Sequence, residues 1–186
     1  MASTLKWVRK KSEETAKDSS SLDTAWRIHG ALVDWTGKVD AKASFAFTIE
    51  SAGVATTVAL SGDKRMFSAL EGPWQNVLYY GGIVALLIAA AFSVWVVIPR
   101  LRMRHVKNEY PNNFIYFGHL QYWKPEDLPR AIAKKDLLPV LTHQMVKMSE
   151  IAWRKHVAVK VSMWLAISGG VVLVTCGAMI RFGLTP

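Results

Sequence analysis

The sequence predicts an all-α membrane protein with three transmembrane helices, two of them extended into a cytosolic helical stalk, plus a short cytosolic helix. Three hydrophobic segments, over residues 43–62, 77–98 and 157–182, are long enough to cross a bilayer, where about 20 apolar residues are needed. Helical spacing of apolar residues also runs from polar sequence into the first and third segments, so we expect both helices to begin in the cytosol.

The chain before the first membrane segment divides into a tail and a helix. Residues 1–20 are charged and rich in serine without apolar periodicity, which predicts a flexible tail. Over residues 21–42, apolar side chains recur every three or four positions and continue without a proline into the membrane segment. Ser21 or Asp23 can accept hydrogen bonds from the first free amides, so we expect the helix to start there.

Glu50 is the strongest single-residue signal, because it lies inside the membrane segment of residues 43–62. A charge in hydrocarbon is costly, and such groups usually face a bundle interior, a partner or water. Glu50 and Thr57 of the same segment are therefore candidates for a pore lining or an intramembrane polar contact. Two other interpretations stay open for Glu50: a protonated acid bonded to serine or threonine, and a helix shifted toward the outer face.

The other two membrane segments are simpler. Residues 77–98 carry no charge, and residues 157–182 carry only Lys160 and Arg181 near their ends, where long basic side chains reach the headgroups. The connection over residues 63–76 is a short external loop.

Small residues recur at every fourth position on one face of each membrane segment, a pattern that permits close helix packing in lipid. The three stripes are Ser44, Thr48, Ala52 and Thr56; Gly81, Ala85, Ala89 and Ser93; and Ser162, Ala166 and Gly170. They can close on one another within a subunit or form a homo-oligomer interface, and the pattern favours neither.

Residues 99–156 form a cytosolic loop and helical region. Pro99 ends or kinks the second membrane helix, and a short helix is expected from Pro125 to about Lys135. From Leu137 onward, helical spacing continues into the third membrane segment. Packed side by side, the two long helices would make the stalk.

Orientation follows from the basic residues, which stay on the cytoplasmic side during insertion. Most of them lie in the first 42 residues and in residues 99–156, whereas the first loop holds only Lys64 and Arg65. We therefore expect a cytoplasmic N-terminus and an external C-terminus, residues 183–186, in a multi-pass membrane protein.

The composition argues against several classes of function. The net charge of +9 reflects topology and contact with anionic lipid, so no nucleic-acid partner is expected. Cys176, the only cysteine, lies in an apolar helix and is interpreted as a packing residue. No phosphate loop, nucleophile elbow or zinc-binding motif occurs and the histidines are scattered, so we expect no enzyme, no metal and no tightly bound cofactor.

Two charged residues should meet near the inner membrane face if the long helices are adjacent. Asp40 on the first helix and Lys155 on the second lie at similar depth and can form an ion pair. The pair is either a structural clasp, the interpretation we favour, or a switch that changes when ligand binds.

Aromatic and basic residues are interleaved in the cytosolic part, among them Trp35, Lys38, Tyr116, Arg130 and Lys147. A nucleotide could be held there by a ring stacked on its base and a cation at its phosphate. The other interpretation, that these aromatics are stalk core or interface anchors, also stands.

Three short motifs resemble the transmembrane effector family of the Pycsar bacterial anti-phage systems. They are Asp40-Ala41-Lys42-Ala43-Ser44 at the entry to the first membrane helix, Phe114-Ile115-Tyr116-Phe117-Gly118-His119, and the helix that bears His143-Gln144 and Lys155. The likeness covers about residues 25–180.

The resemblance implies a membrane effector, encoded beside a nucleotide cyclase, that responds to a cyclic pyrimidine mononucleotide, cCMP or cUMP. It would then disrupt the inner membrane and cause growth arrest or cell death. Separately from the resemblance, we expect a homo-oligomer. Without a separate β-roll module, ligand would bind the helical cytosolic region or an oligomer interface. The ligand-binding candidates are Trp35, Lys38, Lys42, Tyr116, Phe117, Arg130, His143 and Lys147.

Two other functions are compatible with the sequence. One is a small ion channel or transporter subunit without nucleotide control, for which Glu50 and the small-residue stripes are the relevant features. The other is a membrane scaffold that anchors a cytosolic partner through its aromatic loop.

Overall fold

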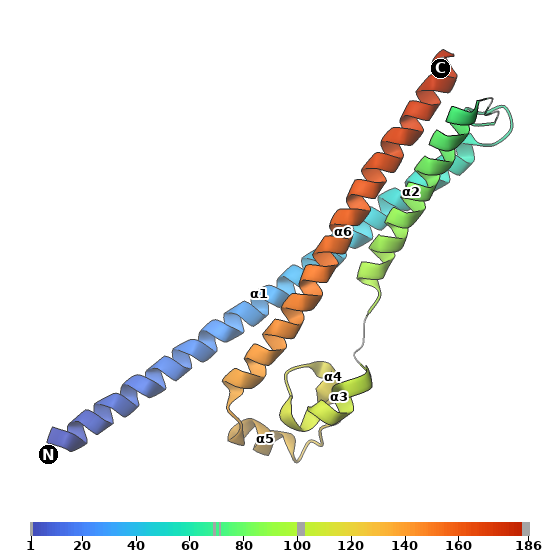
Figure 1. The fold of residues 1–186 in the computed structure, drawn as a ribbon. Helices are drawn as coiled ribbons and strands as arrows, with labels where there is room; N and C mark the ends of the chain where they lie inside the picture. The colour runs from blue at the N-terminus through green and yellow to red at the C-terminus, as the bar shows by residue number, and fades with distance from the viewer. Residues whose placement is uncertain (1, 69, 71, 100–102, 184–186) are drawn as a thin grey trace. The chain divides into compact units, whose positions relative to one another are not determined.

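The computed structural model describes residues 2–68, 70, 72–99 and 103–183, and all regular structure within them is helical (Figure 1). In chain order the elements are α1 (Ala2–Leu60), α2 (Pro73–Val97), α3 (Met103–Glu109), the 3-10 helix η1 (Tyr110–Asn112), α4 (Phe117–Leu120), α5 (Leu128–Lys134) and α6 (Leu137–Phe182). The protein is therefore all-α, as predicted.

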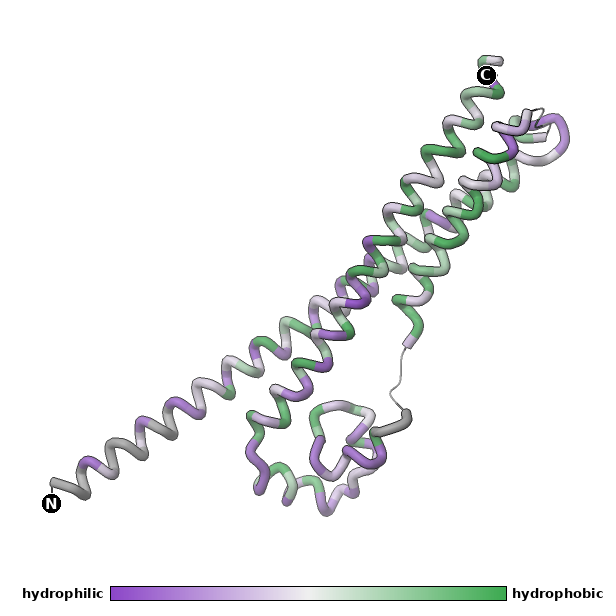
Figure 2. The backbone as a smooth tube through the Cα atoms, viewed as in Figure 1, coloured by the Kyte–Doolittle hydropathy of each residue, from purple (hydrophilic) through white to green (hydrophobic). Residues whose placement is uncertain are grey.

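Three helices can cross a membrane: α2, α6 and the part of α1 from Lys17 to Leu60. Figure 2 shows hydrophobic residues concentrated in α2 and in the C-terminal halves of α1 and α6, with hydrophilic residues toward the other ends of the two long helices. The prediction of three transmembrane helices is confirmed. The cytosolic stalk stays a prediction.

Helix α1 begins earlier than the capping signals indicate. The segment expected to be a flexible tail is helical from Ala2, and the Ser21 hydroxyl donates to the Lys17 carbonyl at 3.0 Å inside the helix instead of capping it. Alanine, glutamate and lysine, which have high helix propensity, are frequent in this segment and explain the difference.

Helix α5 also begins at a different residue. It starts at Leu128, with Pro129 in its first turn, whereas we expect a start at Pro125. Residues 124–127 form turns, so Glu126 and Asp127 precede the helix. Proline is accepted in the first helical turn because the amide it lacks would have no partner there. That rule fits both Pro125 and Pro129, so the sequence did not show which of the two prolines lies in the first turn of the helix.

The chain forms two compact units, which we call the loop unit (Met1–Trp35 with Pro99–Ala152) and the membrane unit (Thr36–Ile98 with Trp153–Pro186). Helices α1 and α6 each contribute residues to both units. All three hydrophobic segments of the sequence lie in the membrane unit.

The membrane unit has two apolar clusters, each with residues from α1 or its following loop, α2 and α6. One cluster contains Val39, Ala43, Val96, Ala158 and Val159. The other contains Phe67, Tyr79, Leu86, Leu173 and Cys176. On α6, the residues of the first cluster precede those of the second, and on α1 the first cluster lies before the loop that supplies Phe67 to the second. On α2 the order is reversed, so α1 and α6 run parallel and α2 runs antiparallel to them.

Helices α2 and α6 approach each other most closely at two glycines. A Cβ atom on Gly82 would lie 3.1 Å from the Gly169 carbonyl oxygen, and one on Gly169 would lie 2.9 Å from the Gly82 carbonyl oxygen. The expected stripes named the neighbouring residues, Gly81 and Gly170, which have open space around them. The glycine register of the prediction is thus wrong by one residue on each helix.

The rest of the stripes behave differently on the three helices. Ala89, Ser93 and Ser162 are buried between α2 and α6. The stripe of α1 is exposed at all four positions, Ser44, Thr48, Ala52 and Thr56. The stripes of α2 and α6 therefore serve packing within one subunit, while that of α1 faces out of it.

The loop unit is held by its aromatic residues. The Tyr110 ring contacts the rings of Tyr122 and Trp123, and the Trp123 indole N–H donates to the Asn113 carbonyl at 3.1 Å. Lys135 donates to the Pro111 carbonyl and to Asn112 Oδ1. These bonds connect the end of α5 to η1 and fix the path of the aromatic segment.

Candidate functional site

A chain of three polar side chains crosses the interior of the membrane unit, with one residue from each helix. The Ser162 hydroxyl of α6 donates to Glu50 Oε1 of α1. Because its proton is used there, the Ser162 oxygen accepts from the Ser93 hydroxyl of α2, at 2.8 Å. Glu50 is 1% exposed and both serines are fully buried. The chain ties the three helices together at one level.

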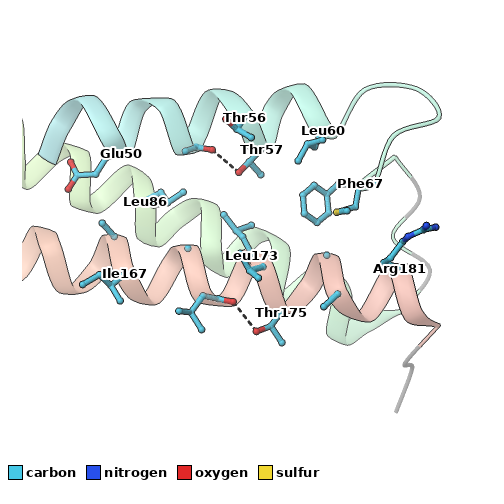
Figure 3. A pocket seen from close by; sticks show the side chains of 18 of the residues that line it. Glu50, Thr56, Thr57, Leu60, Phe67, Leu86, Ile167, Leu173, Thr175 and Arg181 are labelled. Carbon is cyan, nitrogen blue, oxygen red and sulfur yellow. Dashed lines mark hydrogen bonds between the residues drawn. The ribbon is translucent and has the colours of Figure 1, made fainter. Parts of the chain in front are cut away.

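The second carboxyl oxygen of Glu50 has no hydrogen-bond partner within the described residues. Glu50 lines a cavity of about 940 Å³ between α1 and α6, with Leu86 of α2 also in its wall. Figure 3 shows Glu50 at one end of this cavity and Arg181 at the other. Most of the lining is apolar, so Glu50 is an ionisable residue in the wall of a mainly apolar space.

Local packing places Glu50 in this position. Three residues after it, Gly53 faces Leu86, and a Cβ atom there would lie 3.4 Å from a Leu86 methyl. The Thr57 hydroxyl donates to the Gly53 carbonyl at 2.8 Å, so the second intramembrane candidate is satisfied by its own helix. Thr57 is buried and lines the same cavity as Glu50.

The ion pair expected between Asp40 and Lys155 is present. Lys155 Nζ lies 2.6 Å and 2.8 Å from the two carboxylate oxygens of Asp40, and the Lys155 side chain is 16% exposed. Asp40 precedes Glu50 by ten residues, which is roughly 15 Å along the helix. The pair therefore joins α1 to α6 well below the Glu50 chain. Whether it acts as a clasp or a switch stays open.

The ligand-binding candidates are spread over both units. In the loop unit the rings of Tyr116 and Phe117 contact each other with centroids 4.5 Å apart, and Phe117 is 64% exposed. Lys147 forms an ion pair with Glu150 at 3.2 Å. Trp35, Arg130 and His143 are exposed on α1, α5 and α6, and Lys38 and Lys42 are exposed in the membrane unit.

The loop unit contains a pair of a buried histidine and a half-buried glutamate that the sequence did not reveal. His119 Nε2 lies 3.6 Å from Glu109 Oε2, and the His119 ring is packed edge-on against Tyr116. Gly118 is required beside them, since a Cβ atom there would lie 2.3 Å from the Tyr116 ring. The Tyr-Phe-Gly-His motif thus builds a compact corner around α4.

Ser93 and Ser162 are the functional candidates that we miss from sequence. Both belong to the small-residue stripes, where we interpret serine as a packing residue. Their hydroxyls become significant only because Glu50 lies at the same level, which depends on the registers of α1, α2 and α6.

These observations define a class: a multi-pass α-helical membrane protein with a buried acidic polar chain and helices that extend beyond its membrane unit. The Pycsar effector protein domain (PycTM) matches residues 24–182, and the chain belongs to this family. No curated protein and no solved structure matches the chain. Family membership makes the protein a membrane effector of anti-phage defence, linked to a cyclic-nucleotide signalling system.

Proposed function

We propose that a cyclic pyrimidine mononucleotide, cCMP or cUMP, made by a partner cyclase on infection, activates this effector, which then permeabilises the bacterial inner membrane and stops growth or kills the cell. The observation that carries this proposal is the buried Glu50 chain in a family of signalling effectors. In this proposal the protein performs no catalysis, its N-terminus is cytoplasmic and its C-terminus is external.

The Glu50 chain supports a role in membrane permeation. An ionisable residue between transmembrane helices is costly to retain and marks ion or substrate pathways more often than anchors. Here the carboxyl has one oxygen bonded to Ser162 and the other buried without a partner among the described residues, and Glu50 lines the large cavity. A shift of α1 against α2 and α6 would break this chain and leave the carboxyl available to water or to a neighbouring subunit.

The loop unit supplies the groups for nucleotide recognition. The exposed Phe117 ring, in contact with Tyr116, offers a surface for a pyrimidine base, and exposed cations such as Arg130 can meet the phosphate. A ligand changes the state of the protein only as far as it binds the two states differently. We propose that α1 and α6, which contribute to both units, transmit that difference to the membrane unit.

The test uses the full chain reconstituted in vesicles of bacterial lipid that hold a self-quenched dye. Addition of cCMP or cUMP should release the dye, whereas linear CMP or UMP should not. In cells, the protein should be toxic only when co-expressed with an active cyclase. Toxicity without a cyclase would indicate an unregulated channel, and absence of toxicity in both conditions would indicate a scaffold.

A further inference from the structure

The face of the membrane unit between α1 and α6 carries two more cavities in addition to the large one. Their volumes are about 360 Å³ and 380 Å³. Lys42, Met163 and Ile167 line both, so the two cavities adjoin. The second also shares Glu50 with the large cavity, so the three cavities follow one another between α1 and α6. We call this line of cavities the seam.

The first of these cavities has a cationic border. Lys42 of α1 and Lys160 of α6 both line it, together with His156. Both lysines are exposed, and neither forms an ion pair with any residue that the structure describes. Two like charges on one small cavity repel each other unless an anion lies between them. The exposed Trp164 ring on the same border is typical of a membrane interface.

The second cavity is apolar apart from its two ends. Phe45, Ile49, Met163 and Ile167 supply its walls, between Lys42 at one end and Glu50 at the other. Polarity thus changes from cationic to apolar along the helix axes, in the direction from the basic flank of the membrane unit toward its interior. A phospholipid has the same sequence of properties, from its phosphate to its acyl chains.

We propose that an anionic phospholipid of the inner leaflet binds in this seam, with its phosphate between Lys42 and Lys160 and an acyl chain against Ile49 and Ile167. Basic pockets between transmembrane helices on the cytoplasmic side are suited to anionic lipid headgroups. A second copy of the chain, docked here about a two-fold axis, would bring its own Lys42 and Lys160 against Lys42 and Lys160 of the first copy. The like charges would repel, so the lipid fits the site better than a second copy does. The site shares Lys42 with the ligand-binding candidates of the sequence, needs no nucleotide, and rests on the proposed orientation of the chain.

The experiment is native mass spectrometry of the full chain, released from detergent after titration with dioleoyl phosphatidylglycerol or dioleoyl phosphatidylcholine. We expect one phosphatidylglycerol molecule to be retained in preference to phosphatidylcholine. Each basic residue near an anionic lipid surface strengthens attachment about fivefold, so the double variant Lys42→Gln and Lys160→Gln should weaken retention about 25-fold. The control is Lys134→Gln with Arg154→Gln, which removes the same charge from exposed positions outside these cavities and should retain the lipid.

A further variant tests the acyl-chain part of the site. Ile167→Trp fills both cavities, leaves the two lysines in place and should also reduce retention. Unchanged retention in Ile167→Trp would reduce the proposal to surface attraction and overturn it, as would equal losses in the control and the lysine variant. If cCMP or cUMP displaced the lipid through Lys42 and Lys160, the site would belong to the nucleotide phosphate instead. Dye release, measured separately, tests the signalling function, so the two proposals can fail independently.

Discussion

At the scale of single residues, Glu50 has two different surroundings. One carboxyl oxygen accepts from Ser162 inside a chain that reaches Ser93, and the other is buried without a hydrogen-bond partner among the described residues. Glu50 also lines the large cavity, so it is both part of the helix packing and a candidate for function. Substitutions that alter only one of these contacts can separate the two roles.

Glu50→Gln keeps an acceptor oxygen for Ser162 and removes the acid. If the carboxyl serves permeation, this variant should fold normally and lose most of the nucleotide-triggered dye release. Circular dichroism checks the fold, and Glu126→Gln, at an exposed position in the loop unit, is the matched control. Dye release equal to that of the unaltered protein would remove Glu50 from the permeation pathway.

Ser162→Ala removes the donor to Glu50 and breaks the chain between the helices. A buried polar group that loses its partner costs about 1–3 kcal/mol, so the membrane unit should unfold at a lower temperature in detergent. Ser168→Ala on the same helix is the control, because that exposed hydroxyl bonds only to the Leu165 carbonyl of its own helix. Equal melting temperatures for the two variants would show that the buried chain contributes no stability.

The Asp40–Lys155 pair has a prediction of its own. As a clasp, it should contribute about 1 kcal/mol or less, since Asp40 is partly exposed. Asp40→Asn should therefore lower stability slightly and leave ligand-triggered leakage unchanged. Lys155→Gln should lower stability by a similar amount. The exchange of the two residues, Asp40→Lys with Lys155→Asp, should restore stability. Leakage from Asp40→Asn vesicles without nucleotide would identify the pair as a switch.

At the scale of elements, the sequence predicted the long helices better than their ends and contacts. Apolar runs of the required length determine α2 and the membrane parts of α1 and α6, because the hydrocarbon leaves the backbone few alternatives. The start of α1 and the start of α5 were missed, since helix formers and competing prolines blur those signals. Gly82 and Gly169 were missed by one position because the register between two apolar helices follows from packing rather than composition.

Helix continuity between the two units can be tested by weakening α1 near Trp35. Ala31→Gly lowers helix stability by about 1 kcal/mol and Val33→Gly by about half that or less, without touching the ligand-binding candidates. Nucleotide binding, measured by calorimetry, should persist while dye release falls. Val33→Ala, which raises helix propensity at an exposed position, should behave like the unaltered protein. Full dye release from the double glycine variant would exclude α1 as the transmitting element.

At the scale of the whole molecule, the distribution of function over two units explains what the sequence could and could not show. The Asp40–Lys155 pair was predictable because both residues have fixed places at the ends of recognisable membrane segments. The Ser93–Ser162–Glu50 chain was not, because it requires three helix registers at once. The ligand-binding candidates come from separate elements, α1, α4, α5 and α6, so composition alone could not assemble them.

Orientation is also a property of the whole molecule. Since most basic residues lie in the first 42 residues and in residues 99–156, a reporter enzyme that is active only outside the cytoplasm should be active when fused after residue 186. The same reporter inserted in residues 124–127, which form turns, should be inactive, and a fluorescent protein that matures only in the cytoplasm should give the reverse pattern. Activity of the outside reporter at residues 124–127 would reverse the proposed topology.

The glycine contact between α2 and α6 determines which helix can move. Separation of these two helices would uncover backbone at Gly82 and Gly169, and it would also forfeit a close helix contact, since a Cβ atom on either glycine would lie within 3.1 Å of the other glycine's carbonyl oxygen. Helix α1 borders the large cavity, and the Glu50–Ser162 bond and the Asp40–Lys155 pair are its polar contacts with α6 described above, so its displacement would break single polar contacts rather than close glycine packing. We therefore expect the α2–α6 pair to stay together and α1 to be the helix that moves when the effector is activated.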